Sequence, residues 1–160
     1  MFDVGFDEIG AALERDGAAC RQLASRARRN VQSAQPRFPV PREQGLAIAH
    51  AFQTASASGD LSALTALLAD DVVFHADGGG KRPATFRPIL GAPRVLRLLA
   101  GLARKAPQRV LRTCMIDGLP GFVSLAADGL PQTTALAIDG GRITALYVMR
   151  NPDKLHAAGL

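Results

Sequence analysis

Residues 109–149, RVLRTCMIDGLPGFVSLAADGLPQTTALAIDGGRITALYVM, decide the fold of most of the chain. Apolar and polar residues alternate in this stretch with a period of two, which is typical of strands with one buried face. The pattern predicts strands at 109–116, 121–127, 133–139 and 142–149. Turn residues separate these runs at Asp117-Gly118, Asp128-Gly129 and Asp139-Gly140-Gly141. We therefore predict an antiparallel meander.

The residues before the meander switch between helical and strand periodicity. Apolar residues spaced three and four apart predict three helices. These run from Pro41 to about Ser56, from Leu61 to about Ala69, and from Ala92 to about Lys105. A period-two run at 71–77 predicts one more strand, with Val73, His75 and Asp77 on one face and Val72, Phe74 and Ala76 on the other. The expected fold is α+β, with helices covering a curved antiparallel sheet to form a cone-like cavity.

Four polar residues could line such a cavity. His75 and Asp77 share one strand face, and Tyr147 and Arg150 on the last strand are their expected partners. A histidine beside a carboxylate could serve as a general base for an isomerase or cyclase, or the four could hold a ligand. Alternatively, His75 is a half-exposed strand residue, Asp77 accepts hydrogen bonds from the glycines behind it, and Tyr147 fills the core. We favour this second interpretation and predict no catalytic residue.

Two short motifs lie at the ends of the two strands that carry these residues. The first is Asp77-Gly78-Gly79-Gly80-Lys81. It does not match a phosphate-binding loop, which needs two glycines that bracket four residues and a Ser or Thr after the lysine, where this chain has Arg82. Three glycines allow backbone conformations closed to other residues, in either a flexible surface loop or a contact site. The second is Asn151-Pro152-Asp153-Lys154-Leu155, which ends the last strand because proline cannot continue the ladder.

The N-terminal residues 6–31, FDEIGAALERDGAACRQLASRARRNV, have a different pattern. A short apolar helix, a break at Arg15-Asp16-Gly17 and a basic second helix form a helix-turn-helix, with Asp16 as the expected cap of the second helix. The exposed face of that helix carries candidate DNA-binding residues. Arg21 and Gln22 would read base edges, with the residues further along facing phosphates. The full set is Arg21, Gln22, Ser25, Arg26, Arg28 and Arg29. A solvated surface is the alternative.

The distribution of charge supports a polyanionic partner for the N-terminal segment. The 160-residue chain has a formal net charge of +5. From Arg15 to Arg42 there are seven arginines and one acidic residue, Asp16, whereas later residues are nearly balanced at twelve basic to nine acidic. The basic character therefore belongs to the helix-turn-helix and the joint that follows it.

Other functional classes lack their signatures in this sequence. Cys20 and Cys114 are distant and lie in apolar patterns, so we expect buried reduced thiols rather than a disulfide or a metal pair. We expect no metal and no cofactor. No apolar run is long enough to cross a bilayer, and no secretory signal is apparent, so a cytoplasmic location without membrane contact is expected.

The stretch AACRQLASRARR, residues 18–29, resembles region 4 of extracytoplasmic-function sigma factors of RNA polymerase, the region that reads the −35 promoter element. The proline-rich joint at 35–41, the Asp77–Lys81 motif and the Asn151–Leu155 motif are similar to those of the group with a C-terminal SnoaL-like extension. SnoaL-like domains belong to the nuclear transport factor 2-like superfamily, which has the predicted α+β plan. The resemblance covers most of the chain, but region 2 and the first half of region 4 have no counterpart in it.

This resemblance implies a domain organisation and a set of partners. Residues 1–34 would be a partial region 4 helix-turn-helix, 35–41 a linker, and 42–160 a SnoaL-like regulatory domain. The expected partners are promoter DNA, the RNA polymerase core and other sigma regions. The two motifs imply regulatory contacts through Asp77, Gly78, Gly79, Gly80, Lys81, Asn151, Pro152, Asp153 and Lys154. A small-molecule ligand and a homodimer remain open.

Overall fold

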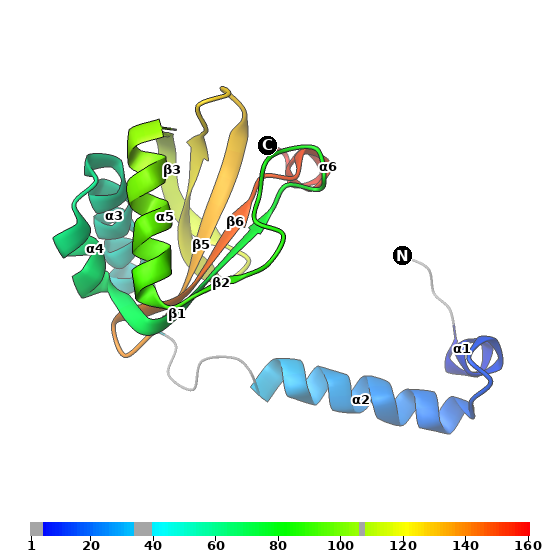
Figure 1. Ribbon diagram of the computed structural model, residues 1–160. Helices are drawn as coiled ribbons and strands as arrows, with labels where there is room; N and C mark the ends of the chain where they lie inside the picture. The colour runs from blue at the N-terminus through cyan, green and yellow to red at the C-terminus, as the bar shows by residue number, and fades with distance from the viewer. Residues whose placement is uncertain (1–4, 34–39, 106–107) are drawn as a thin grey trace. The chain divides into compact units, whose positions relative to one another are not determined.

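The structure is a computed structural model that describes residues 5–33, 40–105 and 108–160, with only the backbone described for 28–33 (Figure 1). The chain divides into two compact units, Met1–Arg37 and Phe38–Leu160. We call them the helical unit and the sheet unit. The division falls within the joint predicted at 35–41, most of which lies outside the described residues.

The helical unit consists of α1 (Phe6–Ala12) and α2 (Gly17–Ser33), as the helix-turn-helix pattern predicts. Asp16 caps α2, because its carboxylate accepts a hydrogen bond from the Ala18 amide at 3.2 Å. Two glycines allow the helices to approach. A Cβ on Gly10 would lie 2.6 Å from the Arg15 carbonyl oxygen, and a Cβ on Gly17 would collide with Asp7. Gly17 therefore improves the packing of this pair, despite its low helix propensity.

The apolar stripe of α2 is only partly covered within the helical unit. Cys20 is buried and Ala24 is half-buried, but Leu23 is 47% exposed. The reason is length. α1 has 7 residues and α2 has 17, so α1 covers only the first turns of its neighbour.

The sheet unit contains one six-stranded sheet with the order β2-β1-β6-β5-β4-β3. Its strands are β1 (Leu68–Asp77), β2 (Ile89–Leu90), β3 (Arg109–Ile116), β4 (Leu119–Leu125), β5 (Pro131–Asp139) and β6 (Arg142–Met149). Its helices are α3 (Arg42–Ser58), α4 (Leu61–Leu67), α5 (Ala92–Lys105) and α6 (Pro152–Ala157). The meander from β3 to β6 is antiparallel throughout, which confirms that prediction.

Two turns of the meander have the predicted hairpin geometry. Asp117 and Gly118 have φ values of 47° and 79°, and Gly140 and Gly141 have 54° and 79°. Two positive φ angles in succession define the tight turn that matches strand twist. β4 starts at Leu119 and ends at Leu125, each two residues earlier than predicted. β5 also starts two residues early, because Pro131 itself opens it, a strand position that proline tolerates.

The prediction of a purely antiparallel sheet was wrong for β1. This strand pairs in parallel with β6, with His75 opposite Tyr147 and Asp77 opposite Met149. The chain reaches β6 only after crossing through α5 and the meander, so period-two patterning could not reveal the partner or its direction. β1 also begins at Leu68, and α4 ends one residue earlier, at Leu67.

Two elements were not predicted. β2 is a two-residue strand in which Leu90 pairs with Val73. The motif that starts at Asn151 was interpreted only as the end of the last strand, and it also forms α6. The Asn151 side chain caps this helix by accepting from the Asp153 amide at 3.1 Å, and Pro152 occupies the first turn.

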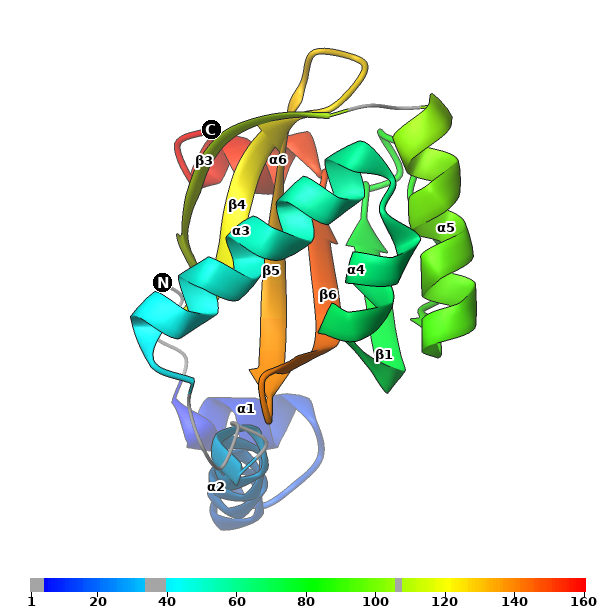
Figure 2. The same ribbon diagram turned by 90° about the vertical axis from the view of Figure 1, so that its left-hand side faces the viewer.

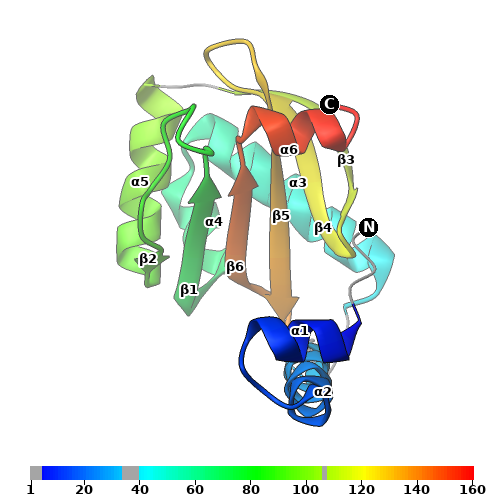
Figure 3. The ribbon, with the colours of Figure 1, turned by 90° about the vertical axis from the view of Figure 1, so that its right-hand side faces the viewer.

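The core of the sheet unit lies between the sheet and the helices α3, α4 and α5 (Figure 2). Val72 and Phe74 of β1 are buried in this core, and Phe52 of α3 lies against Phe122 of β4 with ring centroids 6.4 Å apart. The opposite face of the sheet carries α6 across one end (Figure 3). The architecture is the α+β, helices-over-curved-sheet plan that the sequence predicts.

Candidate functional site

The two motifs identified in the sequence contact each other. The Lys154 ammonium donates to the Asp77 carboxylate, with Nζ 2.7 Å from Oδ2. The Lys81 ammonium donates to both Asp153 carboxylate oxygens at 2.7 Å. Each motif thus supplies one acid and one base, and the two ion pairs cross-link them. We call residues 77–81 with 151–154 the motif contact.

The parallel pairing of β1 with β6 explains why the motifs meet. Both strands end at the same edge, and the Arg150 amide donates to the Asp77 carbonyl at 2.7 Å. Asp77 also accepts from the Gly79 amide at 2.8 Å, the local turn that the non-catalytic interpretation expects. Gly79 has φ +63° and lies directly against the Asn151 side chain, so any Cβ there would collide. The hydrogen bond from Lys154, followed by that from Gly79, holds the pKa of Asp77 below its ordinary value.

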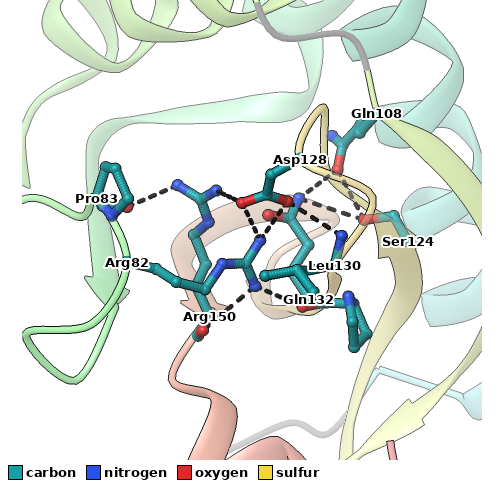
Figure 4. A network of polar contacts seen from close by, with 9 residues as sticks. Arg82, Pro83, Gln108, Ser124, Asp128, Leu130, Gln132 and Arg150 are labelled. Atoms are coloured by element: carbon teal, nitrogen blue, oxygen red, sulfur yellow. Dashed lines mark hydrogen bonds and ion pairs between the residues drawn. The ribbon is translucent and has the colours of Figure 1, made fainter.

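A buried arginine network stands beside the motif contact (Figure 4). Arg82, whose side chain is 5% exposed, binds both Asp128 carboxylate oxygens at 2.8 and 2.9 Å and donates to the Pro131 carbonyl at 2.7 Å. Arg150 lies 3.5 Å from Asp128 and donates to the Pro83 carbonyl at 2.6 Å. One carboxylate therefore serves two guanidinium groups, which leaves an excess positive charge.

This network shifts two pKa values. Burial raises the pKa of Asp128, but hydrogen bonds from Arg82 and the Leu130 amide, with the charges of both arginines, outweigh burial and leave the pKa below its ordinary value. Burial, followed by the charge of Arg82, lowers the pKa of Arg150. The pairing of Arg82 with Asp128 could not be predicted, because each residue lies in a loop and nothing local in the sequence links them.

A cavity of about 540 Å³ lies between α3, α5 and the sheet, with the arginine network at its rim. Its walls are mostly apolar and include Phe52, Phe74, Leu98, Leu99, Phe122 and Leu146. Polar groups on the lining include Ser56, Thr85, Gln108, Asp128, Gln132 and Arg150. The Gln108 side-chain oxygen accepts from Ser124 at 2.8 Å and from Gln132 at 2.7 Å (Figure 4). This cavity is the cone that the fold prediction anticipates.

Four buried polar atoms beside this cavity lack a hydrogen-bond partner within the described parts of the chain. They are the hydroxyl oxygens of Ser56 and Thr85 and the Nε atoms of Arg82 and Arg150. A buried polar group without a partner costs about 1–3 kcal/mol. Since Ser56, Thr85 and Arg150 line the cavity, the unmatched polarity is concentrated there.

The four residues considered for a pocket do not share one. His75 and Tyr147 stack on the opposite face of the sheet, with ring centroids 5.1 Å apart and planes 13° apart. They line an open groove there together with Asp77, whose carboxylate already binds Lys154. Arg150 instead lines the cavity on the helix-covered face of the sheet. The structure therefore does not assemble a histidine–carboxylate pair inside the cone.

The candidate DNA-binding residues lie along α2. Arg21, Gln22, Ser25 and Arg26 are exposed, as the predicted polar face requires. Arg21 also forms an ion pair with Asp7 of α1, with Nη1 3.4 Å from Oδ1. Arg28 and Arg29 continue the helix, but their side chains lie outside the described part.

Neither cysteine forms a disulfide. Cys20 is buried as expected, whereas Cys114 is half-buried on β3 because it faces the open groove. Among the described residues, no cluster of three or more His, Cys, Asp or Glu side chains could hold a metal ion. None of the helices in the described ranges has the length and apolarity needed to cross a membrane.

Comparison with known proteins identifies the relationship. No protein-family model matches the chain. The extracytoplasmic-function RNA polymerase sigma factor SigJ of Mycobacterium tuberculosis is 33% identical over an alignment 177 positions long, which covers 99% of this chain and 54% of SigJ. Over nearly its whole length, this chain is similar to part of an extracytoplasmic-function sigma factor. The crystal structure of SigJ matches with a TM-score of 0.60 and 29% identity, over 96% of this chain and 55% of that one.

More distant solved structures share the fold of the sheet unit. A SnoaL-like protein of Burkholderia thailandensis has 13% identity and a TM-score of 0.55, over 69% of this chain and 97% of its own. An LEH-like epoxide hydrolase of M. tuberculosis has 21% identity and a TM-score of 0.50, over 68% and 83%. The expected SnoaL-like, nuclear transport factor 2-like fold is thus confirmed. This chain spans about half the length of SigJ.

Proposed function

We propose that this chain supplies −35 promoter recognition, and its regulation, to an extracytoplasmic-function sigma factor. In this scheme the helical unit binds DNA and the sheet unit regulates sigma activity. One observation carries the proposal. A capped helix pair exposes arginines and a glutamine on its second helix, in a chain homologous to a sigma factor.

The exposed face of α2 suits the major groove. Arg21 and Gln22 lie in the early turns of the helix, the part that approaches base edges in helix-turn-helix proteins. Both side chains can bond a base edge bidentately. Arg26 lies further along, where contact with phosphates is expected, and Arg28 and Arg29 extend the basic run.

The ion pair between Arg21 and Asp7 is compatible with this role. Their side chains are 55% and 88% exposed, and such surface pairs contribute about 0–1 kcal/mol. A good bidentate contact to a base contributes about 1–3 kcal/mol to discrimination. Arg21 can therefore leave Asp7 for DNA at a small cost, while Asp7 orients it in the free protein.

For regulation, we propose that the motif contact is the surface reached by other sigma regions or by the RNA polymerase core. Lys81 and Asp153 keep 56% and 67% of their side-chain area exposed, so both can exchange partners with an incoming charged surface. We further infer that the chain is not an enzyme, because His75 and Asp77 lie outside the cavity and Asp77 is already engaged.

The DNA-binding proposal can be tested with the complete 160-residue chain. A duplex is first selected from a randomised pool, and affinities are then measured by fluorescence anisotropy on that duplex and on a scrambled one. Gln22→Ala and Arg21→Ala should each lose about 5- to 150-fold on the selected duplex, and much less on the scrambled one.

Asp7→Asn is the matched control for Arg21→Ala, because it breaks the same ion pair but keeps the guanidinium. Its affinity should equal or exceed that of the parent chain. If Gln22→Ala and Arg21→Ala lose affinity equally on both duplexes, the base-reading role is wrong. If no duplex is selected, the DNA-binding role is wrong.

A further inference from the structure

The cavity of the sheet unit has the features of a binding site for a small molecule. Its volume of about 540 Å³ lies within the range of pockets that hold drug-sized ligands. The rings of Phe52, Phe74 and Phe122 contribute to its wall, which favours a compact ring system over a polar metabolite.

Several polar groups that line the cavity have no hydrogen-bond acceptor in the described part of the chain. The hydroxyls of Ser56 and Thr85 and the Nε of Arg150 lack partners within the described residues, and all three groups can donate. Ser56 is only 8% exposed. An incoming oxygen acceptor would satisfy groups that the folded chain leaves unmatched.

The charge at the rim indicates the kind of acceptor. Arg82 and Arg150 share the single carboxylate of Asp128, so among the described residues one positive charge of the network is uncompensated. Thr85 lies on the same loop as Pro83, whose carbonyl holds the Arg150 guanidinium. A carboxylate near Arg150 would therefore find both a charge and a hydroxyl donor.

We infer that the cavity binds a compact aromatic or alicyclic carboxylate, with its ring against the phenylalanines and its head group at Arg150, Thr85 and Ser56. This inference goes beyond promoter recognition and does not depend on it. It also places the site next to the motif contact, because Arg150 directly precedes Asn151 and Arg82 directly follows Lys81. Occupancy would tighten the loop and strand end that carry the two motifs.

The probe we suggest is naphthalene-2-carboxylate, with naphthalene-2-methanol as the uncharged counterpart. The chain has no tryptophan and one tyrosine, so the fluorescence of the naphthalene ring can be read directly during titration of the full chain. We expect saturable binding of the carboxylate below about 1 mM, and at least about tenfold weaker binding of the alcohol.

Variants then locate the site. Ser56→Leu should abolish binding by filling the cavity. Thr85→Val, nearly isosteric, should weaken the carboxylate by about three- to tenfold. Arg150→Gln should remove the preference for the carboxylate over the alcohol. His75→Gln, in the groove on the opposite face of the sheet, should change nothing. Circular dichroism checks that each variant is folded. If Ser56→Leu or Arg150→Gln unfolds the chain, the result for Thr85→Val decides.

Three results would overturn the inference. The first is no binding of the carboxylate up to about 1 mM. The second is equal affinity for carboxylate and alcohol. The third is loss of binding in His75→Gln with retention in Thr85→Val, which would move the ligand to the open groove. No DNA is present in these titrations, so each result leaves the promoter-binding proposal standing.

Discussion

Replacing Arg82 with methionine should destabilise the sheet unit far more than replacing its neighbour Lys81. Arg82→Met keeps the length and apolar stem of the side chain but removes two hydrogen bonds to Asp128, one to the Pro131 carbonyl and one to the Arg150 carbonyl. The arginine side chain is 5% exposed and that of Asp128 is 40% exposed. The loss therefore leaves a partly buried carboxylate whose remaining partners are Arg150, 3.5 Å away, and the Leu130 amide.

The magnitude follows from these exposures. Breaking a fully buried ion pair from one side costs about 3–5 kcal/mol, whereas an exposed pair contributes about 0–1 kcal/mol. Because water can solvate part of Asp128, we expect a loss of about 2–3 kcal/mol in the free energy of unfolding for Arg82→Met. Lys81→Met removes an exposed ion pair and should cost less than about 1 kcal/mol.

The assay is urea unfolding of the full chain followed by far-ultraviolet circular dichroism. The midpoint should fall with an unchanged slope, because the surface exposed on unfolding stays the same. Arg82→Lys should recover part of the loss, since an ammonium keeps the charge but not the two-pronged contact. Equal losses for Arg82→Met and Lys81→Met would refute the assignment of Arg82 as the centre of a buried network.

Three further changes have defined outcomes. The folded-state pKa of Asp128 lies below its unfolded value, so its contribution to stability is present above about pH 5 and is lost as the pH falls below about 4; Asp128→Asn should flatten this acid limb of the unfolding free energy. Gly79→Ala should cost at least about 2 kcal/mol by thermal melting because a Cβ meets Asn151, whereas Gly80→Ala, with a similar φ but open space, should cost about 1 kcal/mol. Asp60 caps α4, because its carboxylate accepts a hydrogen bond from the Ala63 amide at 2.9 Å. Asp60→Ala should therefore lower the free energy of unfolding by about 1 kcal/mol, as measured in urea; a loss near zero would show that the cap is dispensable.

The sequence predicted those features that depend on nearby residues. Period-two alternation located the meander, helical spacing located α5 at its observed bounds, and the cap at Asp16 has its predicted hydrogen bond. It could not predict that β1 pairs with β6, because that partnership depends on a crossover rather than on local pattern. The motif contact follows from this pairing, so the sequence marked both motifs without showing that they bind each other.

The candidate site was harder to predict for the same reason. Arg82, Asp128 and Arg150 come from three separate loops or strand ends, and only the assembled sheet brings them together. His75 and Asp77 drew attention because their residue types suit catalysis. Alternation correctly placed them on the face of β1 opposite Phe74, and the helices cover the Phe74 face. The sequence pattern did not show on which face of the sheet the cavity would lie.

The position of β6 has a consequence for how the protein is made. This strand lies between β1 and β5 in the sheet, yet it is the last strand to leave the ribosome. Until it arrives, β1 lacks its main neighbour and β5 has an open edge, and such edges are prone to aggregation. The helical unit, which precedes the sheet unit in the chain and is built only from local contacts, can form its helix pair while the sheet is still incomplete. The strand that completes the sheet is therefore followed at once by the segment that links the two motifs.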